Sequence, residues 1–170
     1  MRNKIDKMTR TALCVAILSV LSQLSIPIGT TFLTLQIFAV ALVGYLLGSK
    51  ASLVSVTVYI FVGAVGAPVF AGFRGGFSVL LGYTGGFIFG FIPLCVLCGI
   101  AKCGKIKRVL FGFLGVIVCH LLGVVQYMLL SDLDFISSFT LVSLPYILKD
   151  MVLIVCACAL AEIISKRIKA

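Results

Sequence analysis

Long apolar runs separated by short groups of charged residues dominate the pattern of this sequence. A helix needs roughly 20 apolar residues to cross the hydrocarbon core of a bilayer, and several of the runs approach that length. One long run is interrupted at 48–50, so we interpret it as two shorter spans, and Pro27 with Gly29 would end the first span. The pattern predicts six membrane-spanning helices, at about residues 9–28, 35–47, 51–65, 82–101, 109–130 and 142–165.

A glycine-rich stretch, residues 66–91, follows the third of these spans and reads GAPVFAGFRGGFSVLLGYTGGFIFGF. Irregular backbone is not tolerated against lipid, because each unpaired N–H or C=O group costs several kcal/mol. The stretch also contains Arg74, and an ionisable group near membrane depth marks a candidate functional site. We therefore expect a partly re-entrant external loop between the third and fourth helices that forms one wall of a small-molecule site. The alternative is a plain connector whose arginine reaches back to the membrane surface.

The composition is that of an integral membrane protein. Of the 170 residues, 62% are hydrophobic and only 11% are charged, and the mean hydropathy is +1.28. Soluble domains are typically about 45–50% apolar and about 25% charged. Because the sequence contains no internal repeat or linker, we expect one all-α transmembrane domain over residues 1–170.

Positive charge gathers on one side of the expected bundle. A net charge of +9 would suggest nucleic-acid binding in a soluble protein. Here, however, most cations lie at the two ends of the chain and in two loops, so the positive-inside rule places both termini in the cytoplasm and no nucleic acid is expected as a partner. The two remaining cations, Arg74 and Lys149, then lie on the outer side. The cytoplasmic cations are Arg2, Lys4, Lys7, Arg10, Lys50, Lys102, Lys105, Lys107, Arg108, Lys166, Arg167 and Lys169.

The sequence offers little catalytic or metal-binding chemistry. It has one histidine, five carboxylates and no H-E-x-x-H or G-x-S-x-G motif, so we do not expect an enzyme. A near match to the phosphate loop ends in Ile106, which lacks the hydroxyl that would bind Mg²⁺. The cysteines lie in or beside apolar spans, as small buried hydrophobes do, and we expect no metal and no cofactor. We interpret His120, alone in the fifth span, as a helix-to-helix hydrogen bond in preference to a proton relay.

Five polar residues fall at the outer level of the expected bundle: Gln36, Arg74, Thr84, Lys149 and Asp150. Small-molecule sites are mostly apolar pockets with a few directed polar groups. A cation suits a ligand carboxylate, and an acid with an amide suits N–H donors on a ring. Because Lys149 and Asp150 are adjacent, they point to different sides of a helix, and each is expected to have its own partner.

The first span contains a pair of small residues, Ala12 and Ala16, four positions apart. Such a pair lies on one helix face and lets another helix approach closely within lipid. Packing inside the bundle and docking of a partner both remain open on this evidence.

Three blocks of the sequence resemble the BioY family, the biotin-specific substrate-binding components of energy-coupling-factor transporters. The blocks are Thr34-Leu-Gln36 with the following AVALVGYLLG, the central GAPVFAGFRGG…GYTGGFIFGF, and Leu144-Pro-Tyr-Ile-Leu-Lys-Asp150. Together with their spacing they cover most of the chain. The sequence departs from the family pattern at Leu153, where many relatives have a lysine, and at Tyr83, where the usual residue is proline.

The resemblance implies six helices with a vitamin site on the external face. It implies that Asp150 accepts hydrogen bonds from the ureido N–H groups of biotin. Residues of the 68–91 block, with Phe70 and Gly85 among them, would surround the bicyclic ring and the valerate chain. Either Arg74 or Lys149 would hold the carboxylate.

The resemblance also implies a function and partners. The expected role is biotin uptake across the bacterial plasma membrane, with a transmembrane coupling subunit and a pair of ATP-binding-cassette ATPases supplying the energy. The Ala12 and Ala16 face would then dock on the coupling subunit within the lipid bilayer. The alternatives are a substrate-binding component for another small vitamin, and a non-catalytic membrane scaffold or membrane enzyme.

Overall fold

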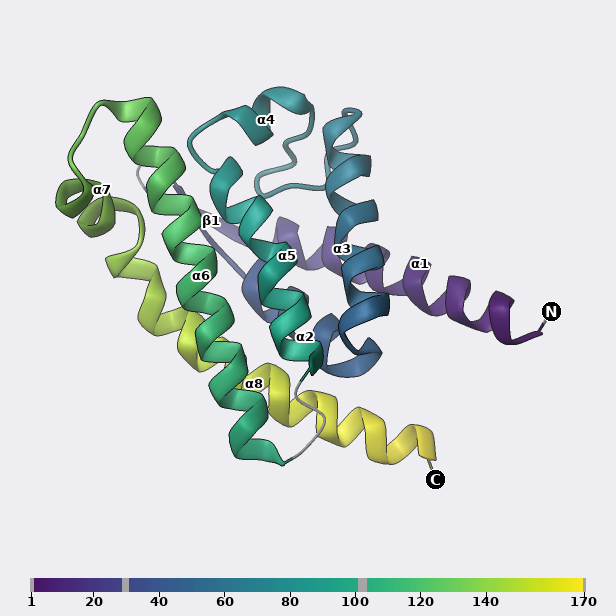
Figure 1. Ribbon diagram of the computed structural model, residues 1–170. Helices are drawn as coiled ribbons and strands as arrows, with labels where there is room; N and C mark the ends of the chain where they lie inside the picture. The colour runs from purple at the N-terminus through teal and green to yellow at the C-terminus, as the bar shows by residue number, and fades with distance from the viewer. Residues whose placement is uncertain (1, 29–30, 101–103, 170) are drawn as a thin grey trace.

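Helices make up most of the structure (Figure 1), a computed structural model that describes residues 2–28, 31–100 and 104–169. Gly29, expected to help end the first span, and Lys102, assigned to the cytoplasmic side, lie outside these residues. The elements in order are α1 (Arg2–Gln23), β1 (Ser25–Ile28), β2 (Thr31–Thr34), α2 (Gln36–Leu47), α3 (Ser49–Ala64), α4 (Phe77–Leu81), α5 (Gly85–Ile100), α6 (Lys105–Ser131), α7 (Phe135–Val142) and α8 (Leu144–Lys169).

Six long helices stand where the apolar pattern predicts the six spans. Among the described residues, α6 is long and apolar enough to cross a membrane by length and composition alone. Four further apolar segments are shorter: Met8–Gln23, α2, α3 and α5. The positions of the helices thus follow the prediction, whereas the sidedness of the termini stays a prediction.

The prediction of an all-α fold is incomplete, because a small antiparallel hairpin joins α1 to α2. Its strands β1 and β2 pair Ser25 with Thr34 at one end and Ile28 with Thr31 at the other. The first helix ends at Gln23 because Pro27 has no N–H to donate and disfavours helical backbone in the residue before it. The predicted extension of this span to residue 28 is therefore wrong.

Close helix packing depends on glycine at several helix crossings. A Cβ on Gly44 of α2 would lie 2.7 Å from the carbonyl oxygen of Cys95 on α5. A Cβ on Gly90 of α5 would lie 2.7 Å from the Cα of Cys119 on α6. Small residues at such crossings let two backbones approach, which favours van der Waals packing where lipid supplies no hydrophobic driving force.

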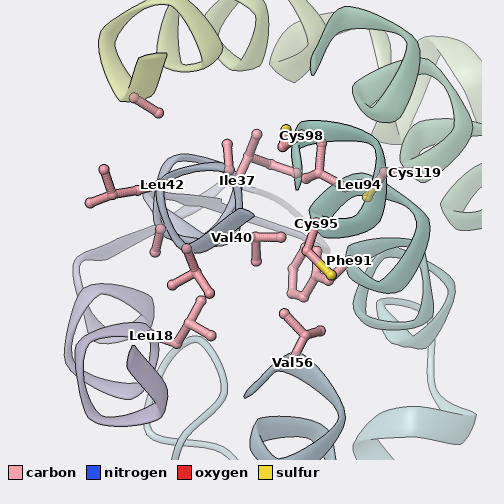
Figure 2. Packing of buried hydrophobic residues seen from close by; sticks show 14 of the residues in the cluster. Leu18, Ile37, Val40, Leu42, Val56, Phe91, Leu94, Cys95, Cys98 and Cys119 are labelled. Atoms are coloured by element: carbon pink, nitrogen blue, oxygen red, sulfur yellow. The ribbon is translucent and has the colours of Figure 1, made fainter. Parts of the chain in front are cut away.

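The core lies between α2, α3 and α5, and α2 is buried along most of its length. Figure 2 shows Val40 of α2 beside Phe91 and Cys95 of α5, with Val56 of α3 reaching the same cluster. Leu18 of α1 packs against the other side of α2. A helix that is apolar on all sides must be surrounded by protein or lipid, and here it is surrounded by protein.

The glycine-rich segment becomes a loop, residues 65–84, that contains α4 and lies at the opposite end of the molecule from the C-terminus (Figure 1). It is folded on itself: Phe70 N–H donates to Arg74 O at 2.9 Å, and Gly76 N–H donates to Gly63 O at 2.7 Å. A Cβ on Gly75 would lie 2.2 Å from Ala67 O, so only glycine permits this close approach. The loop is thus an ordered structure, and its depth in the membrane stays a prediction.

Candidate ligand-binding pocket

A pocket lies at the end of the bundle that carries the 65–84 loop. Its empty space is about 670 Å³, counting the part that opens to the surroundings. Side chains from β2, α2, the loop, α5, α6, α7 and α8 line it. Six of the seven residues predicted to bind substrate line this one pocket: Gln36, Phe70, Arg74, Thr84, Lys149 and Asp150.

Asp150 forms the centre of the polar end of the pocket. Its carboxylate is almost fully buried, and its Oδ2 lies 3.1 Å from Nε2 of His120 on α6. The other ring nitrogen, Nδ1, lies 2.8 Å from the hydroxyl of Ser143, just before α8. A buried charge is tolerated only where it is paired and hydrogen-bonded, and His120 provides the hydrogen bond.

Lys149 is the cation that balances Asp150. Its ammonium lies 2.8 Å from Asp150 Oδ1 and donates to the carbonyl oxygen of Thr34, also at 2.8 Å. The expectation that the two adjacent charges have separate partners is therefore wrong in part: each has a partner of its own, but they also pair with one another. Asp150 Oδ1 makes no hydrogen bond of good geometry with the described residues.

Gln36 begins α2 and joins the pocket to the core. Its amide Nε2 donates to the hydroxyl of Tyr59 at 3.1 Å, and its Oε1 accepts from the hydroxyl of Thr34 at 3.3 Å. The Tyr59 hydroxyl in turn donates to the carbonyl oxygen of Val69 in the loop at 2.9 Å. These bonds fix the amide and tie the loop to α2 and α3.

Aromatic and aliphatic side chains form the apolar wall. Phe70 is fully buried and meets Tyr59 edge to face, with ring centroids 5.6 Å apart. Phe87, Ile88 and Phe91 project from one face of α5 into the same pocket. Such a wall excludes water from the ligand and strengthens the polar contacts beside it.

Arg74 lies at the mouth of the pocket. It is exposed, and it lines both this pocket and a neighbouring surface hollow formed by the loop. Its Nε donates to Ala71 O at 3.4 Å, which keeps it over the loop. With Lys149, it gives the pocket two cations against the single carboxylate of Asp150, so the local field favours an anionic ligand.

Gly85, the seventh predicted residue, is not among the residues that line the pocket. It is buried, and a Cβ there would lie 1.8 Å from Leu80 O and 2.6 Å from Nε2 of Gln126. The Gln126 amide donates to Leu80 O and Gly82 O, at 2.9 and 2.7 Å. Because Gly85 has no side chain, the loop can pack against α6 at this point. Its neighbour Thr84 lines the pocket.

Sequence reasoning missed His120 and Tyr146 as pocket residues. His120 does make the expected helix-to-helix hydrogen bond, but its partner is the candidate ligand-binding acid. The sequence shows no acid close to His120, because Asp150 is brought there only by the packing of α8 against α6. The signal in the sequence is the polarity of both residues within apolar helices, since such groups seek one another.

The small pair Ala12 and Ala16 lies elsewhere, on α1. Both residues are exposed, so packing within the described bundle does not account for the pair. Its role as a docking face stays a prediction.

Among the described residues, no group of three or more His, Cys, Asp or Glu side chains is placed to hold a metal ion. The described cysteines are free thiols.

Comparison with known proteins gives a consistent result. The family model described as the BioY family matches residues 1–170. The "Probable biotin transporter BioY" of Pyrococcus horikoshii is 40% identical over 94% of this chain and 96% of its own length. The "Biotin transporter BioY2" of Lactococcus lactis is 30% identical over 88% of this chain and 84% of its own.

A solved structure has the same fold. The crystal structure of "the S-component for biotin from an ECF-type ABC transporter" superposes with a TM-score of 0.90 at 24% identity, covering 97% of this chain and 93% of that one. The sequence match over the full chain decides the assignment, and the chain belongs to the BioY family.

Proposed function

We propose that this membrane protein is the substrate-binding component of a biotin uptake system. The observation that carries the proposal is the pocket, which joins a buried carboxylate, an apolar wall and an exposed cation in one space. Biotin has matching parts: a cyclic urea with two N–H donors, an apolar ring and chain, and a terminal carboxylate. The family membership and the names of its relatives support the same ligand.

The ring of biotin would lie at the Asp150 end. The carboxylate is a strong acceptor for the ureido N–H groups, and a charge-assisted bond of this kind is about twice as strong as a neutral one. Phe87 and Phe91 of α5 would contact the apolar faces of the bicyclic ring. Gln36 would complete the polar end.

The carboxylate of biotin would lie at Arg74. Lys149 is a poor candidate, because its ammonium is 2.8 Å from Asp150 and a second carboxylate there would face the first. Arg74 is exposed and also lines the neighbouring surface hollow, and its planar guanidinium matches carboxylate geometry. The ureido end of biotin would thus lie at the negative Asp150, and its carboxylate end at the positive Arg74.

Energy for uptake would come from partner subunits. The sequence contains no complete nucleotide-binding motif. A transmembrane coupling subunit and a pair of ATP-binding-cassette ATPases would supply ATP hydrolysis, and the exposed Ala12 and Ala16 face of α1 would dock on the coupling subunit. The chain would cross the plasma membrane six times, bind biotin outside and carry out no catalysis itself.

Equilibrium binding to the purified protein in detergent tests the ligand. Radiolabelled biotin should bind saturably, and unlabelled biotin should compete better than biotin methyl ester, which lacks the anionic charge. Riboflavin serves as the control for a different vitamin. If riboflavin competes and biotin does not, the protein is a component for another vitamin, and if nothing binds saturably the scaffold alternative is favoured.

A further inference from the structure

The buried side chains behind Asp150 form a continuous chain of hydrogen bonds. Ser143 Oγ lies 2.8 Å from His120 Nδ1, and His120 Nε2 lies 3.1 Å from Asp150 Oδ2. Each of the three residues is no more than 3% exposed. Ser143 lies between α7 and α8, Asp150 lies on α8, and His120 lies on α6. The two hydrogen bonds therefore also join these helices.

The chemistry of these groups fixes which one donates and which one accepts in each hydrogen bond. An ionised carboxylate only accepts hydrogen bonds, so His120 Nε2 must carry the proton that it shares with Asp150. A neutral imidazole then has an unprotonated Nδ1, which accepts from the Ser143 hydroxyl. Ser143 thus donates to His120, and His120 donates to Asp150.

The balance of charge favours a neutral imidazole. Asp150 already has a cation 2.8 Å away, the ammonium of Lys149. An imidazolium would place a second positive charge beside the same single carboxylate, where His120 and Asp150 are both buried, and Arg74 lines the same pocket. An uncompensated buried charge is strongly unfavourable.

We propose that His120 is a positioning residue for ligand recognition, held as the neutral Nε2–H tautomer by Ser143. It occupies Oδ2 of Asp150, so that Oδ1 is the oxygen that accepts an N–H group of the ligand. Oδ1 is suited to this because it makes the ion pair with Lys149 but no hydrogen bond of good geometry with the described residues. This inference rests on the proposed function for the identity of the ligand, but not for the state of the ring.

A contact with Phe87 holds the imidazole in place. The two rings meet edge to face, with centroids 5.5 Å apart and planes at 90°. Phe87 lines the pocket as well, so the ring that would contact the ligand also fixes the ring that orients the acid. The arrangement of His120 and Asp150 selects for a ligand that donates N–H groups at the Asp150 end of the pocket. A ligand acceptor there would face Asp150 Oδ1, which has no proton to donate.

Nitrogen-15 NMR of the tag-free protein reads the tautomer directly, because His120 is the chain's single histidine. Without ligand, we expect one protonated nitrogen, Nε2, and one unprotonated nitrogen, Nδ1. Ser143→Ala should shift the Nδ1 signal. Ser138→Ala is the matched control: Ser138 is equally buried, and its hydroxyl has no hydrogen-bond partner among the described residues, so the ring signals should not move. A protonated Nδ1, with or without Nε2–H, would overturn the proposal.

Binding measurements test the consequence for recognition. His120→Leu should weaken biotin binding by about tenfold or more, because Asp150 loses its donor and its orientation. His120→Gln places an amide N–H near the same point, so it should restore affinity to within about threefold of the original. Equal affinities for the original protein and the Leu variant, or a Gln variant as weak as Leu, would contradict the proposal.

The two readouts separate this proposal from the proposed function. If the unmodified protein fails to bind biotin, the proposed function fails, and the NMR spectrum still decides the tautomer. If it binds biotin but the ring carries its proton on Nδ1, the function stands and the positioning role is rejected. If His120→Leu shows no thermal unfolding transition, that variant does not fold. The proposal is then tested by the affinity of His120→Gln and by the NMR spectrum of the original protein.

Discussion

Asp150 is surrounded by groups of three different kinds, and each restricts what the carboxylate can do. His120 holds one oxygen, Lys149 balances the charge, and the apolar wall keeps water away. The result is a carboxylate that its neighbours hold in one position. A preorganised site of this kind loses little free energy to ordering on binding, so its few contacts contribute strongly to affinity.

Replacing Asp150 by Asn tests this centre. The variant keeps the shape but loses the charge-assisted bond, so biotin binding should weaken by about 1.5–3 kcal/mol, or roughly tenfold to hundredfold in Kd. Titration with labelled biotin measures the change. Ser55→Ala is the control, since Ser55 is fully buried and, among the described residues, its hydroxyl bonds only within its own helix, to Ala51 O. An unchanged Kd for Asp150→Asn would remove this acid from the site.

Arg74 should act on the other end of the ligand. We expect Arg74→Gln to reduce the preference for biotin over its methyl ester from about tenfold or more to near unity, because only the anion gains from the guanidinium. Competition binding gives this ratio directly. Lys50→Gln removes an exposed cation at the start of α3 and should leave the ratio unchanged. If Arg74→Gln keeps the original preference for biotin over its methyl ester, the biotin carboxylate binds to another residue.

The residues that the sequence could and could not identify differ in a physical way. Arg74, Lys149 and Asp150 stand out because a charge inside an apolar stretch has few structural explanations. His120 gives no such signal alone, since its role depends on an acid thirty positions away that only the fold brings near. Gly85 stands out only as part of a sequence motif, and its environment shows a packing role.

At the scale of elements, the helices approach one another through glycines. Gly44→Ala on α2 should destabilise the protein by about 1–3 kcal/mol, because the new methyl group meets the backbone of α5 at 2.7 Å. Thermal unfolding in detergent measures this. Gly82→Ala is the less crowded comparison and should cost less, as a Cβ there meets Ser78 O at 3.2 Å, still a tight contact, and the φ angle of −84° suits any residue. Equal transition temperatures for the two variants would rule out a tight α2–α5 crossing.

The short helix α7 depends on its cap. Asp134 accepts from the backbone N–H groups of Ile136 and Ser137 at 3.1 and 3.2 Å. Hydrogen bonds from the side chain and backbone of Ser137 hold the pKa of Asp134 below its ordinary value. A lowered pKa means that the cap stabilises α7 above the unfolded-state pKa and is lost as pH falls through the folded-state value.

Asp134→Ala should therefore increase hydrogen exchange across 135–138 at neutral pH. Asp134→Asn should restore most of the protection, because Asn also caps helices well. After correction for the intrinsic pH dependence of amide exchange, acidification should lower the protection factors of the original protein and leave those of the Asn variant unaffected. Exchange that is identical in all three proteins would show that the cap does not hold α7.

Long apolar runs predict the six long helices because membrane crossing imposes a minimum length. The same criterion overlooks short elements. The strands β1 and β2 and the helices α4 and α7 are each eight residues or shorter, and their formation depends on Pro27, Asp134 and contacts with the bundle rather than on hydrophobic length. These short elements shape the pocket: Thr34, Val79 and Val142 line it from β2, α4 and α7.

At the scale of the whole molecule, the two ends of the bundle differ in chemistry. The pocket end carries the loop, with Arg74 at its surface. The other end carries exposed basic residues and a surface pair, Lys105 with Glu162 at 2.8 Å, which joins the start of α6 to α8. This polarity suits a component that meets its ligand on one side of the membrane and is anchored by its charge on the other.

The exposed face of α1 should be needed for assembly and not for binding. Ala12→Leu adds bulk where a partner helix would approach, so co-purification with the coupling subunit and ATP-dependent biotin uptake should both fall severalfold, while the Kd for biotin in detergent stays unchanged. Ala159→Leu makes the same change at an exposed alanine on α8 and should affect neither. Because the described residues that line the pocket include none of α1, a loss of binding in Ala12→Leu would indicate a folding defect. Normal assembly of Ala12→Leu would move the docking surface to another face of the bundle.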